Sequence, residues 1–275
     1  MPAVREWGAV GLQFDRRDGI AWLTLNRPER RNAITPDLRR ALIAAIAEVR
    51  DDPEIRAAVV TGSGAAFCSG ADLACDWAEI PVARQRGTMA NVAREDGRRY
   101  GWWRLIRDVW ENEKPFVAAV NGPAYGFGCN FALACDIVVA AESAQFCEVF
   151  VKRGLPVEAG GAYLMTRYLS PALAKEMTLL GEPLSGTRAA EIGLANRCVA
   201  DDQLLDVAAD FATRLALLPT IGVGHIKGQI NDAYESTFEQ AWKNEVTLTG
   251  VGIGSDSEEA AAAFTERREP RFTGR

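Results

Sequence analysis

The sequence predicts an α/β chain in which short apolar strands alternate with helices. Apolar runs at Ile20–Leu25, Ala57–Thr61 and Phe116–Asn121 have the length and composition of buried strands. Thr35 followed by Pro36 is a typical helix start, with a capping side chain before a proline at the first helical position. The apolar residues that follow recur at helical spacing, so we expect an amphipathic helix there.

Two stretches of this α/β region look alike. Ala57–Leu73 and Phe116–Leu133 each run from a strand through a glycine-containing loop into an apolar segment that can start a helix, the second of them from Phe131. This pairing indicates an internal repeat. Between the two lies a different stretch, Glu79–Glu113, which is charged, rich in tryptophan and helical in composition. We interpret it as a helical insertion that could form a pocket wall.

The composition is that of an ordinary globular protein of 275 residues, with 48% apolar and 25% charged residues. The formal net charge of −6 argues against a general nucleic-acid-binding surface. No stretch approaches the roughly 20 consecutive apolar residues of a membrane helix, and Met1–Gly11 lacks the apolar run of a signal peptide. We therefore expect a cytoplasmic protein that binds no nucleic acid and does not span a membrane.

Cysteine and histidine usage narrows the chemistry. The six cysteines match no paired Cys-x-x-Cys site, and in a cytosolic protein we expect them to be reduced and structural. The sequence has a single histidine, His225, which does not favour a His-rich metal site or a Ser-His-Asp triad. Neither G-x-x-x-x-G-K-[ST] nor G-x-S-x-G occurs. Carboxylates and backbone amides remain as candidate catalytic groups, and we expect no metal.

Several segments occur in the order of one known family. Ala66–Leu73 and Asn121–Asn130 resemble the two segments that supply the oxyanion-hole amides in the enoyl-CoA hydratase/isomerase (crotonase) superfamily. The other matching segments are Asn26-Arg27-Pro28, Asn32-Ala33, Gln145-Phe146, Gly154-Leu155-Pro156, Gly160-Gly161 and Ala263–Arg268. The chain is similar to this superfamily over most of Ile20–Cys198 and again near the C-terminus.

The resemblance implies a crotonase-like spiral of repeated strand–strand–helix units, followed by a helical C-terminal oligomerisation region. Past Asp201 the chain is mainly helical, so we divide it into a spiral core, residues 1–205, and a helical C-terminal region, residues 206–275. In relatives that region forms a trimer, often paired into a hexamer. The substrate implied is an acyl-CoA thioester, and no separate cofactor is expected because coenzyme A is part of the substrate.

Two main-chain amides are the catalytic groups that the resemblance assigns first, those of Ala71 and Phe127. They would stabilise negative charge on the thioester oxygen, and loss of one such donor typically costs about 3–4 kcal/mol. The family usually has glycine at the position of Phe127, so a side chain there could restrict the loop or narrow the pocket. The amide itself is retained.

The acids of the family are partly missing. The two glutamates of the hydratases align with Asn130 and Phe150; Asn130 could orient a water molecule, but neither residue can transfer a proton as a carboxylate does. Glu158 aligns with an acidic position used by some isomerases, where one carboxylate moves a proton from the alpha to the gamma carbon. Weaker candidates are Asp76, Glu79, Glu111 and Glu148.

Contacts with the substrate are also implied by the resemblance. Arg30–Ala33 would flank the adenine and phosphate end of coenzyme A, and Phe264 and Arg267 would reach a ligand of a neighbouring subunit. The full set of substrate-binding candidates is Arg30, Arg31, Ala33, Ala71, Asp72, Leu73, Phe127, Phe264 and Arg267.

Three functions remain open from the sequence. The preferred one is an enoyl-CoA isomerase that uses Glu158 as acid and base. The second is an enoyl-CoA hydratase (a lyase) with an atypical site, in which Asn130 and another acid share the work. The third is a crotonase-like protein that binds acyl-CoA without turnover.

Overall fold

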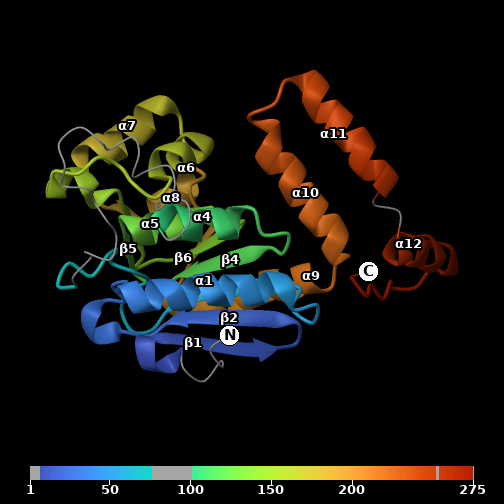
Figure 1. Cartoon of the computed structure of the whole chain (residues 1–275), viewed down its shortest axis with the longest axis horizontal. Coiled ribbons are helices and arrows are strands. Elements are labelled where there is room, and N and C mark those ends of the chain that lie inside the picture. Colours follow the sequence, from blue (N-terminus) through green and yellow to red (C-terminus); the bar gives the residue numbers. More distant parts are fainter. Residues whose placement is uncertain (1–6, 76–100, 252–253, 275) are drawn as a thin grey trace.

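The computed structural model describes residues 7–75, 101–251 and 254–274. Within these residues the chain forms a central six-stranded sheet in the order β1-β2-β3-β4-β6-β9 (Figure 1). Strand β1 is antiparallel to β2, and every other neighbouring pair is parallel. The strands are β1 (Leu12–Arg17), β2 (Ile20–Leu25), β3 (Ala57–Gly62), β4 (Phe116–Val120), β6 (Ile137–Ala141) and β9 (Arg197–Val199).

A second, smaller sheet joins β5, β7 and β8. Its strands are β5 (Pro123–Tyr125), β7 (Gln145–Cys147) and β8 (Leu184–Ser185). The chain passes from the large sheet to the small one twice, from β4 to β5 and from β6 to β7, and each passage is followed by helical residues. This alternation confirms the predicted α/β spiral of strand–strand–helix units.

Helices pack on the large sheet and on one another. In chain order they are α1 (Pro36–Asp51), α4 (Trp102–Trp110), α5 (Phe127–Ala134), α6 (Gly161–Tyr168), α7 (Pro171–Leu180), α8 (Gly186–Glu191) and α9 (Leu204–Ala216). Helix α9 packs on β3, β4 and β6, while α4 contacts both α1 and α5. The short 3-10 helices are η2 (Gly8–Val10), η3 (Pro28–Arg30), η4 (Val149–Arg153) and η5 (Asp201–Gln203).

Local sequence signals placed several of these elements correctly. The strand predicted at Ile20–Leu25 has those bounds, and Thr35 caps helix α1 by accepting a hydrogen bond from the Leu38 amide at 3.1 Å. Helix α5 starts at Phe127, four residues before the predicted start at Phe131, and this puts the Phe127 amide in the first turn. Of the predicted helical insertion, the structure describes α4; residues 76–100, including Asp76 and Glu79, lie outside the described residues.

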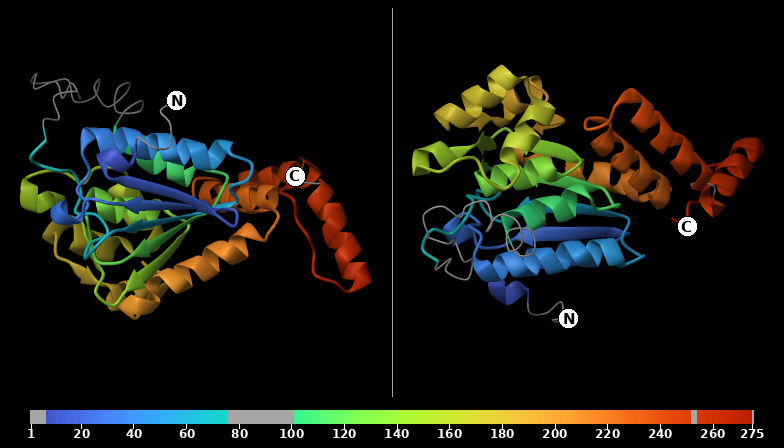
Figure 2. Two further views of the ribbon diagram at one scale, coloured as in Figure 1. Left: turned by 90° about the horizontal axis from the view of Figure 1, so that it is seen from below. Right: turned by 45° about the horizontal axis from the view of Figure 1, so that its top comes forward.

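Past α9 the chain continues into three helices that we call the C-terminal arm: α10 (Thr220–Ala233), α11 (Phe238–Val251) and α12 (Ser255–Glu266). Figures 1 and 2 show α11 and α12 extending away from the two sheets. Polar contacts tie α10 to the core: Lys227 Nζ lies 2.9 Å from Asp136 Oδ2, and Asn231 Nδ2 donates to the Trp110 carbonyl at 3.0 Å. The predicted boundary at residue 205 stays a prediction; it falls in the first turn of α9, which packs on the large sheet.

No helix among the described residues is both long and apolar enough to cross a bilayer. The same residues contain no group of three or more histidine, cysteine, aspartate or glutamate side chains placed to hold a metal ion.

Candidate active site

Two loops from distant parts of the sequence cross beside the small sheet. The first loop is Phe67–Asp72, after β3. The second is Tyr125–Gly128, at the junction where β5 ends and α5 begins. The amides of Phe67 and Cys68 both donate to the Pro123 carbonyl, at 3.1 and 3.0 Å. The Tyr125 amide in turn donates to the Cys68 carbonyl at 2.9 Å. Backbone hydrogen bonds therefore fix the two loops against each other.

Two glycines permit this close crossing. Gly70 has φ +95°, and a methyl group placed on it would lie 3.0 Å from the Tyr125 carbonyl oxygen and 3.8 Å from the Phe127 nitrogen. A methyl group on Gly128 would lie 2.1 Å from the Cys68 carbonyl oxygen, which is closer than real atoms approach. A side chain at either position would push the loops apart.

The amides of Ala71 and Phe127 are both available for a ligand. Ile34 pairs with Ala71 in a parallel bridge: it donates to the Gly70 carbonyl and accepts from the Asp72 amide, each at 2.8 Å. The Ala71 amide therefore points away from Ile34, as the parallel pattern requires. Phe127 occupies the first helical position of α5, where an amide has no intrahelical acceptor. Within the described part of the chain, neither amide has a hydrogen-bond acceptor.

Two asparagines anchor the turn that leads into the first loop. The Asn32 side chain is fully buried; its Nδ2 donates to the Ala66 and Ser63 carbonyls at 2.7 and 3.0 Å. Asn121 Nδ2 donates to the Gly64 carbonyl at 2.9 Å, and its Oδ1 accepts from the Gly62 amide at 3.1 Å. Both residues belong to segments matched to the family, but their anchoring role was not predicted; asparagine beside a glycine-rich turn was the available signal.

The Phe127 side chain packs among other aromatic rings. The residue is 4% exposed, and its ring centroid lies 4.6 Å from that of Trp102 and 5.5 Å from that of Phe131. The ring thus joins helix α4 to helix α5 and sits in the core. From the sequence, it was open whether this side chain would narrow the pocket. In the structure its ring packs on Trp102 and Phe131.

Most of the predicted coenzyme A positions are brought together at the first loop. Asp72 is 4% exposed and pairs with both Arg27 and Arg30, each at 3.0 Å. Burial acts to raise the pKa of Asp72, but hydrogen bonds from Arg30, the Ala74 amide and Arg27 outweigh it and hold the pKa below its ordinary value. The carboxylate is therefore a fixed anion that orders the two arginines.

The other predicted contacts divide into near and distant residues. Ala33 is buried next to the Ile34–Ala71 bridge, while Arg31 and Leu73 are exposed on the same side of the molecule. Phe264, 87% exposed, and Arg267 lie at the end of α12, at the opposite end of the molecule from the first loop (Figures 1 and 2). The single chain does not bring those two residues to the loops.

Glu158 lies in the loop between η4 and α6, close to the first turns of α5. The residue is exposed, but the protein around its carboxyl group raises the pKa above the ordinary value of 4.5 by desolvation. The Glu158 carbonyl oxygen accepts a hydrogen bond from Asn130 Nδ2 at 2.9 Å. Phe150, at the second hydratase position, is 9% exposed, and its ring lies beside Gly126.

Glu148, a weaker candidate in the sequence, is the most buried acid of this region. Its side chain is fully buried, and neither carboxyl oxygen has a hydrogen bond of normal geometry among the described residues. Burial raises its pKa to about 8, although the nearby Cys129 thiol acts to lower it. Burial also raises the pKa of Cys129 well above that of a free thiol, so Cys129 is a poor nucleophile.

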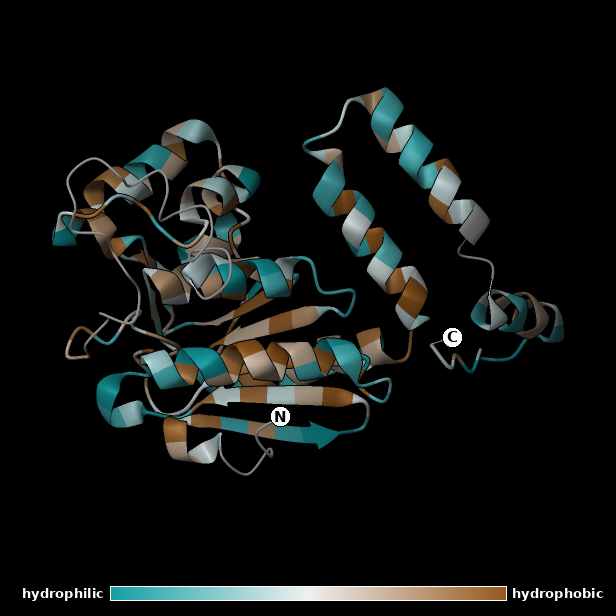
Figure 3. Ribbon diagram, in the orientation of Figure 1, coloured by the Kyte–Doolittle hydropathy of each residue, from teal (hydrophilic) through white to brown (hydrophobic). Residues whose placement is uncertain are grey.

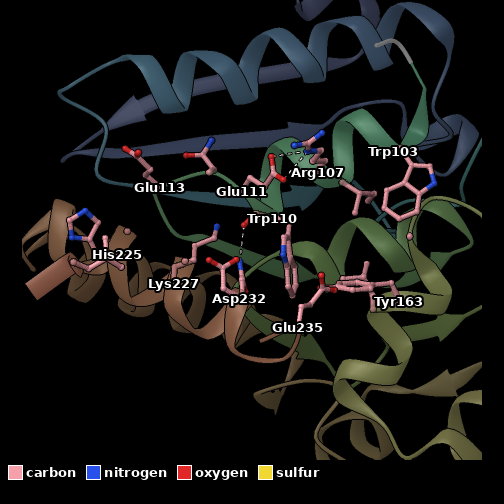
Figure 4. A pocket seen from close by; sticks show the side chains of 18 of the residues that line it. Trp103, Arg107, Trp110, Glu111, Glu113, Tyr163, His225, Lys227, Asp232 and Glu235 are labelled. Carbon is pink, nitrogen blue, oxygen red and sulfur yellow. Dashed lines mark hydrogen bonds and ion pairs between the residues drawn. The ribbon is translucent and has the colours of Figure 1, made fainter. Parts of the chain in front are cut away.

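A cavity of about 840 Å³ lies between α4, α6 and α10 (Figure 4). Trp103, Trp110 and Tyr163 supply aromatic surface, and His225 and Glu111, a weaker catalytic candidate from the sequence, also line it. Its lining does not include Ala71, Phe127, Asn130 or Glu158. Glu111 pairs with Arg107 at 2.8 Å, so its carboxylate serves a surface ion pair on α4.

The fold and the paired loops correspond to those of a known family. The family model described as enoyl-CoA hydratase/isomerase matches residues 15–275. The chain belongs to this family, which confirms the predicted crotonase superfamily membership, and it is an enzyme of the hydratase/isomerase class that acts on acyl-CoA.

Similar proteins carry names from both reaction types. The chain is 37% identical to 1,2-epoxyphenylacetyl-CoA isomerase of Escherichia coli (strain K12), over 94% of this chain and 96% of that one. It is 29% identical to crotonyl-CoA hydratase of Syntrophomonas wolfei, over 94% and 96%. The crystal structure of an enoyl-CoA hydratase from Polaromonas sp. JS666 superimposes with a TM-score of 0.83, at 32% identity, over 95% of this chain and 99% of that one.

Proposed function

We propose that this chain is an enoyl-CoA isomerase in which Glu158 is the acid and base. The observation that carries the proposal is the combination of acids at the loops: one partly desolvated carboxylate at position 158, and an amide and a phenyl ring where hydratases have carboxylates. Hydration with two carboxylates has no second acid to use here, whereas isomerisation needs one.

In the proposed reaction the Glu158 carboxylate removes a proton from the alpha carbon of a 3-enoyl thioester. The electron pair of that C–H bond forms a dienolate, with negative charge on the thioester oxygen. The amides of Ala71 and Phe127 donate hydrogen bonds to this oxygen, and the helix dipole of α5 adds a favourable field. Glu158 then returns the proton to the gamma carbon, so the double bond moves from the 3,4 to the 2,3 position.

The coenzyme A end and the subunit arrangement are further parts of the proposal. Arg30, Arg31 and Ala33 flank the adenine and phosphates, with Asp72 and Leu73 on the adjoining loop. The exposed apolar side chains of the C-terminal arm support a homotrimer or hexamer, in which Phe264 and Arg267 reach the ligand of a neighbouring subunit. No cofactor apart from the coenzyme A of the substrate takes part.

The test separates the two reactions. The protein is incubated with 3-enoyl-CoA, and conjugation of the thioester is followed by absorbance; in parallel, 2-enoyl-CoA is used to follow hydration. We expect isomerisation to dominate and Glu158→Gln to lower its kcat by at least about 10³-fold, because the amide cannot accept the alpha proton. Glu191→Gln, which removes an exposed ion pair with Arg188 on α8, is the matched control and should retain wild-type activity.

Other outcomes assign the other functions. Undiminished isomerisation by Glu158→Gln would remove Glu158 from the mechanism. Faster hydration than isomerisation would favour the atypical hydratase. Tight binding of acyl-CoA thioesters without any conversion would favour a binding protein.

A further inference from the structure

Asn130 makes a specific contact with the main chain of the Glu158 loop. The side chain is fully buried, one turn after Phe127 in helix α5, and its Nδ2 donates to the Glu158 carbonyl at 2.9 Å. The same carbonyl accepts from the Gly161 amide at 3.1 Å. The residue that carries the proposed base is therefore tied to α5 through its main chain, and its carboxylate stays available to the substrate.

The loop that Asn130 holds has an uncommon backbone conformation. Ala159 has φ +52° and Gly160 has φ +76°, so two consecutive residues after Glu158 are left-handed. For a residue with a side chain, such as Ala159, this region costs free energy and persists only where the surroundings impose it. A methyl group on Gly161 would lie 2.7 and 2.8 Å from the Asn130 amide atoms, so the loop is packed directly on this side chain.

We propose that Asn130 is a positioning residue, which fixes the Glu158 carboxylate relative to the oxyanion amide of Phe127. Both groups are then attached to one rigid element, because Phe127 and Asn130 lie one helical turn apart in α5. The distance between base and oxyanion donor is set by that turn and by one hydrogen bond. This inference rests on the proposed role of Glu158.

The chemistry of the amide explains why a carboxylate at this position would not serve. An ionised Glu or Asp at position 130 offers only acceptor oxygens and cannot donate to the Glu158 carbonyl. An amide donates through Nδ2, which is why an asparagine can anchor the loop. In this interpretation Asn130 transfers no proton, unlike the hydratase glutamate at this position, and instead positions the base Glu158.

The experiment is a kinetic double-mutant cycle on the full-length protein with 3-enoyl-CoA. Asn130→Leu keeps the approximate size of the side chain and removes the donor, and Asn130→Ala removes both. We expect each to lower kcat by about 10- to 100-fold with KM changed by less than about 3-fold, since a misplaced base costs rate more than binding. The matched control is Asn112→Ala, another buried asparagine, which bonds to the Ile46 carbonyl and the Lys114 amide; its kcat should equal that of the wild type.

The decisive comparison is made on the Glu158→Gln background. If Asn130 acts through Glu158, then Asn130→Leu/Glu158→Gln should be no slower than Glu158→Gln alone. Multiplicative losses in the double variant, or unchanged kcat in both single Asn130 variants, would overturn the inference. Circular dichroism and the thermal midpoint identify a variant that fails to fold, and in that case the other Asn130 variant completes the cycle. Full activity of Glu158→Gln alone is a separate result, which rejects the proposed function itself.

Discussion

The crossed loops and the C-terminal arm differ in how far contacts within the chain fix and cover them. In the loops the main chain is fixed by internal hydrogen bonds, and Gly70 and Gly128 leave no room for a side chain. The arm is held to the core by polar contacts such as the Lys227–Asp136 pair. Figure 3 shows hydrophobic residues interspersed with hydrophilic ones along α10 and α11. Exposed apolar side chains recur there at four-residue spacing: Ile226 and Ile230 on α10, Tyr234 at its C-cap, and Phe238, Trp242 and Val246 on α11.

This difference indicates what each region requires. The loops need nothing outside the chain to hold their geometry, so a catalytic site can be assembled within one subunit. Apolar residues repeated every four positions lie along one side of a helix, and an exposed surface of this kind is typical of an interaction site, which the proposed trimer would supply. The contrast can be tested by disturbing each region in turn.

The largest effect is expected where the loops cross. Gly128→Ala places a methyl group against the Cys68 carbonyl and moves the loops apart, which would displace the proposed oxyanion amides of Ala71 and Phe127 from each other. We expect kcat to fall by about 10³-fold, comparable to the loss of an oxyanion donor. The control is Gly228→Ala on α10, where a methyl group meets no atom within 4 Å and should leave kcat unchanged. Wild-type turnover by Gly128→Ala would mean that the close crossing is not required.

A second effect concerns the buried acid beside the second loop. The carboxyl group of an unfolded glutamate ionises near 4.5, but burial raises the pKa of Glu148 to about 8 in the folded protein. Between these values the folded state holds a proton that the unfolded state releases, so rising pH favours unfolding. This group alone should lower the free energy of unfolding by about 3 kcal/mol between about pH 5 and pH 8.

The measurement is urea unfolding at the two pH values. Glu148→Gln should lose this pH dependence, and Glu176→Gln, at an exposed position on α7, should keep it. Equal pH dependence in wild type and Glu148→Gln would show that Glu148 is ionised in the folded protein at neutral pH.

The smallest effect on the isolated chain is expected in the arm. Ile226→Ser/Ile230→Ser changes two exposed side chains, so the stability of a single subunit should change by less than about 0.5 kcal/mol per site. The assembly should nevertheless dissociate at lower protein concentration, which light scattering after size exclusion measures. Glu245→Ser, an exposed polar change on α11, is the control. If the wild-type protein is already monomeric, the proposed trimer is rejected, and the arm has no assembly for these substitutions to disturb.

Local sequence patterns predicted the elements well where each element depends on its own residues. The strand at Ile20–Leu25 and the cap at Thr35 follow from neighbours in the chain. The two loop segments and Glu158 were identified by resemblance, because motifs keep their order along the sequence. The start of α5 was placed four residues late, since the stretch before Phe131 has glycines that favour a loop.

The sequence by itself determined the family, the strand–strand–helix repeat and the identities of the candidate acid and amides. Only the tertiary structure decided that Phe127 packs on Trp102, that Glu148 is buried, and that Asn130 binds the Glu158 carbonyl. These facts join residues that lie about 20 to 30 positions apart, or that belong to different helices. Their contacts depend on how the elements pack, and no local propensity or motif specifies that packing.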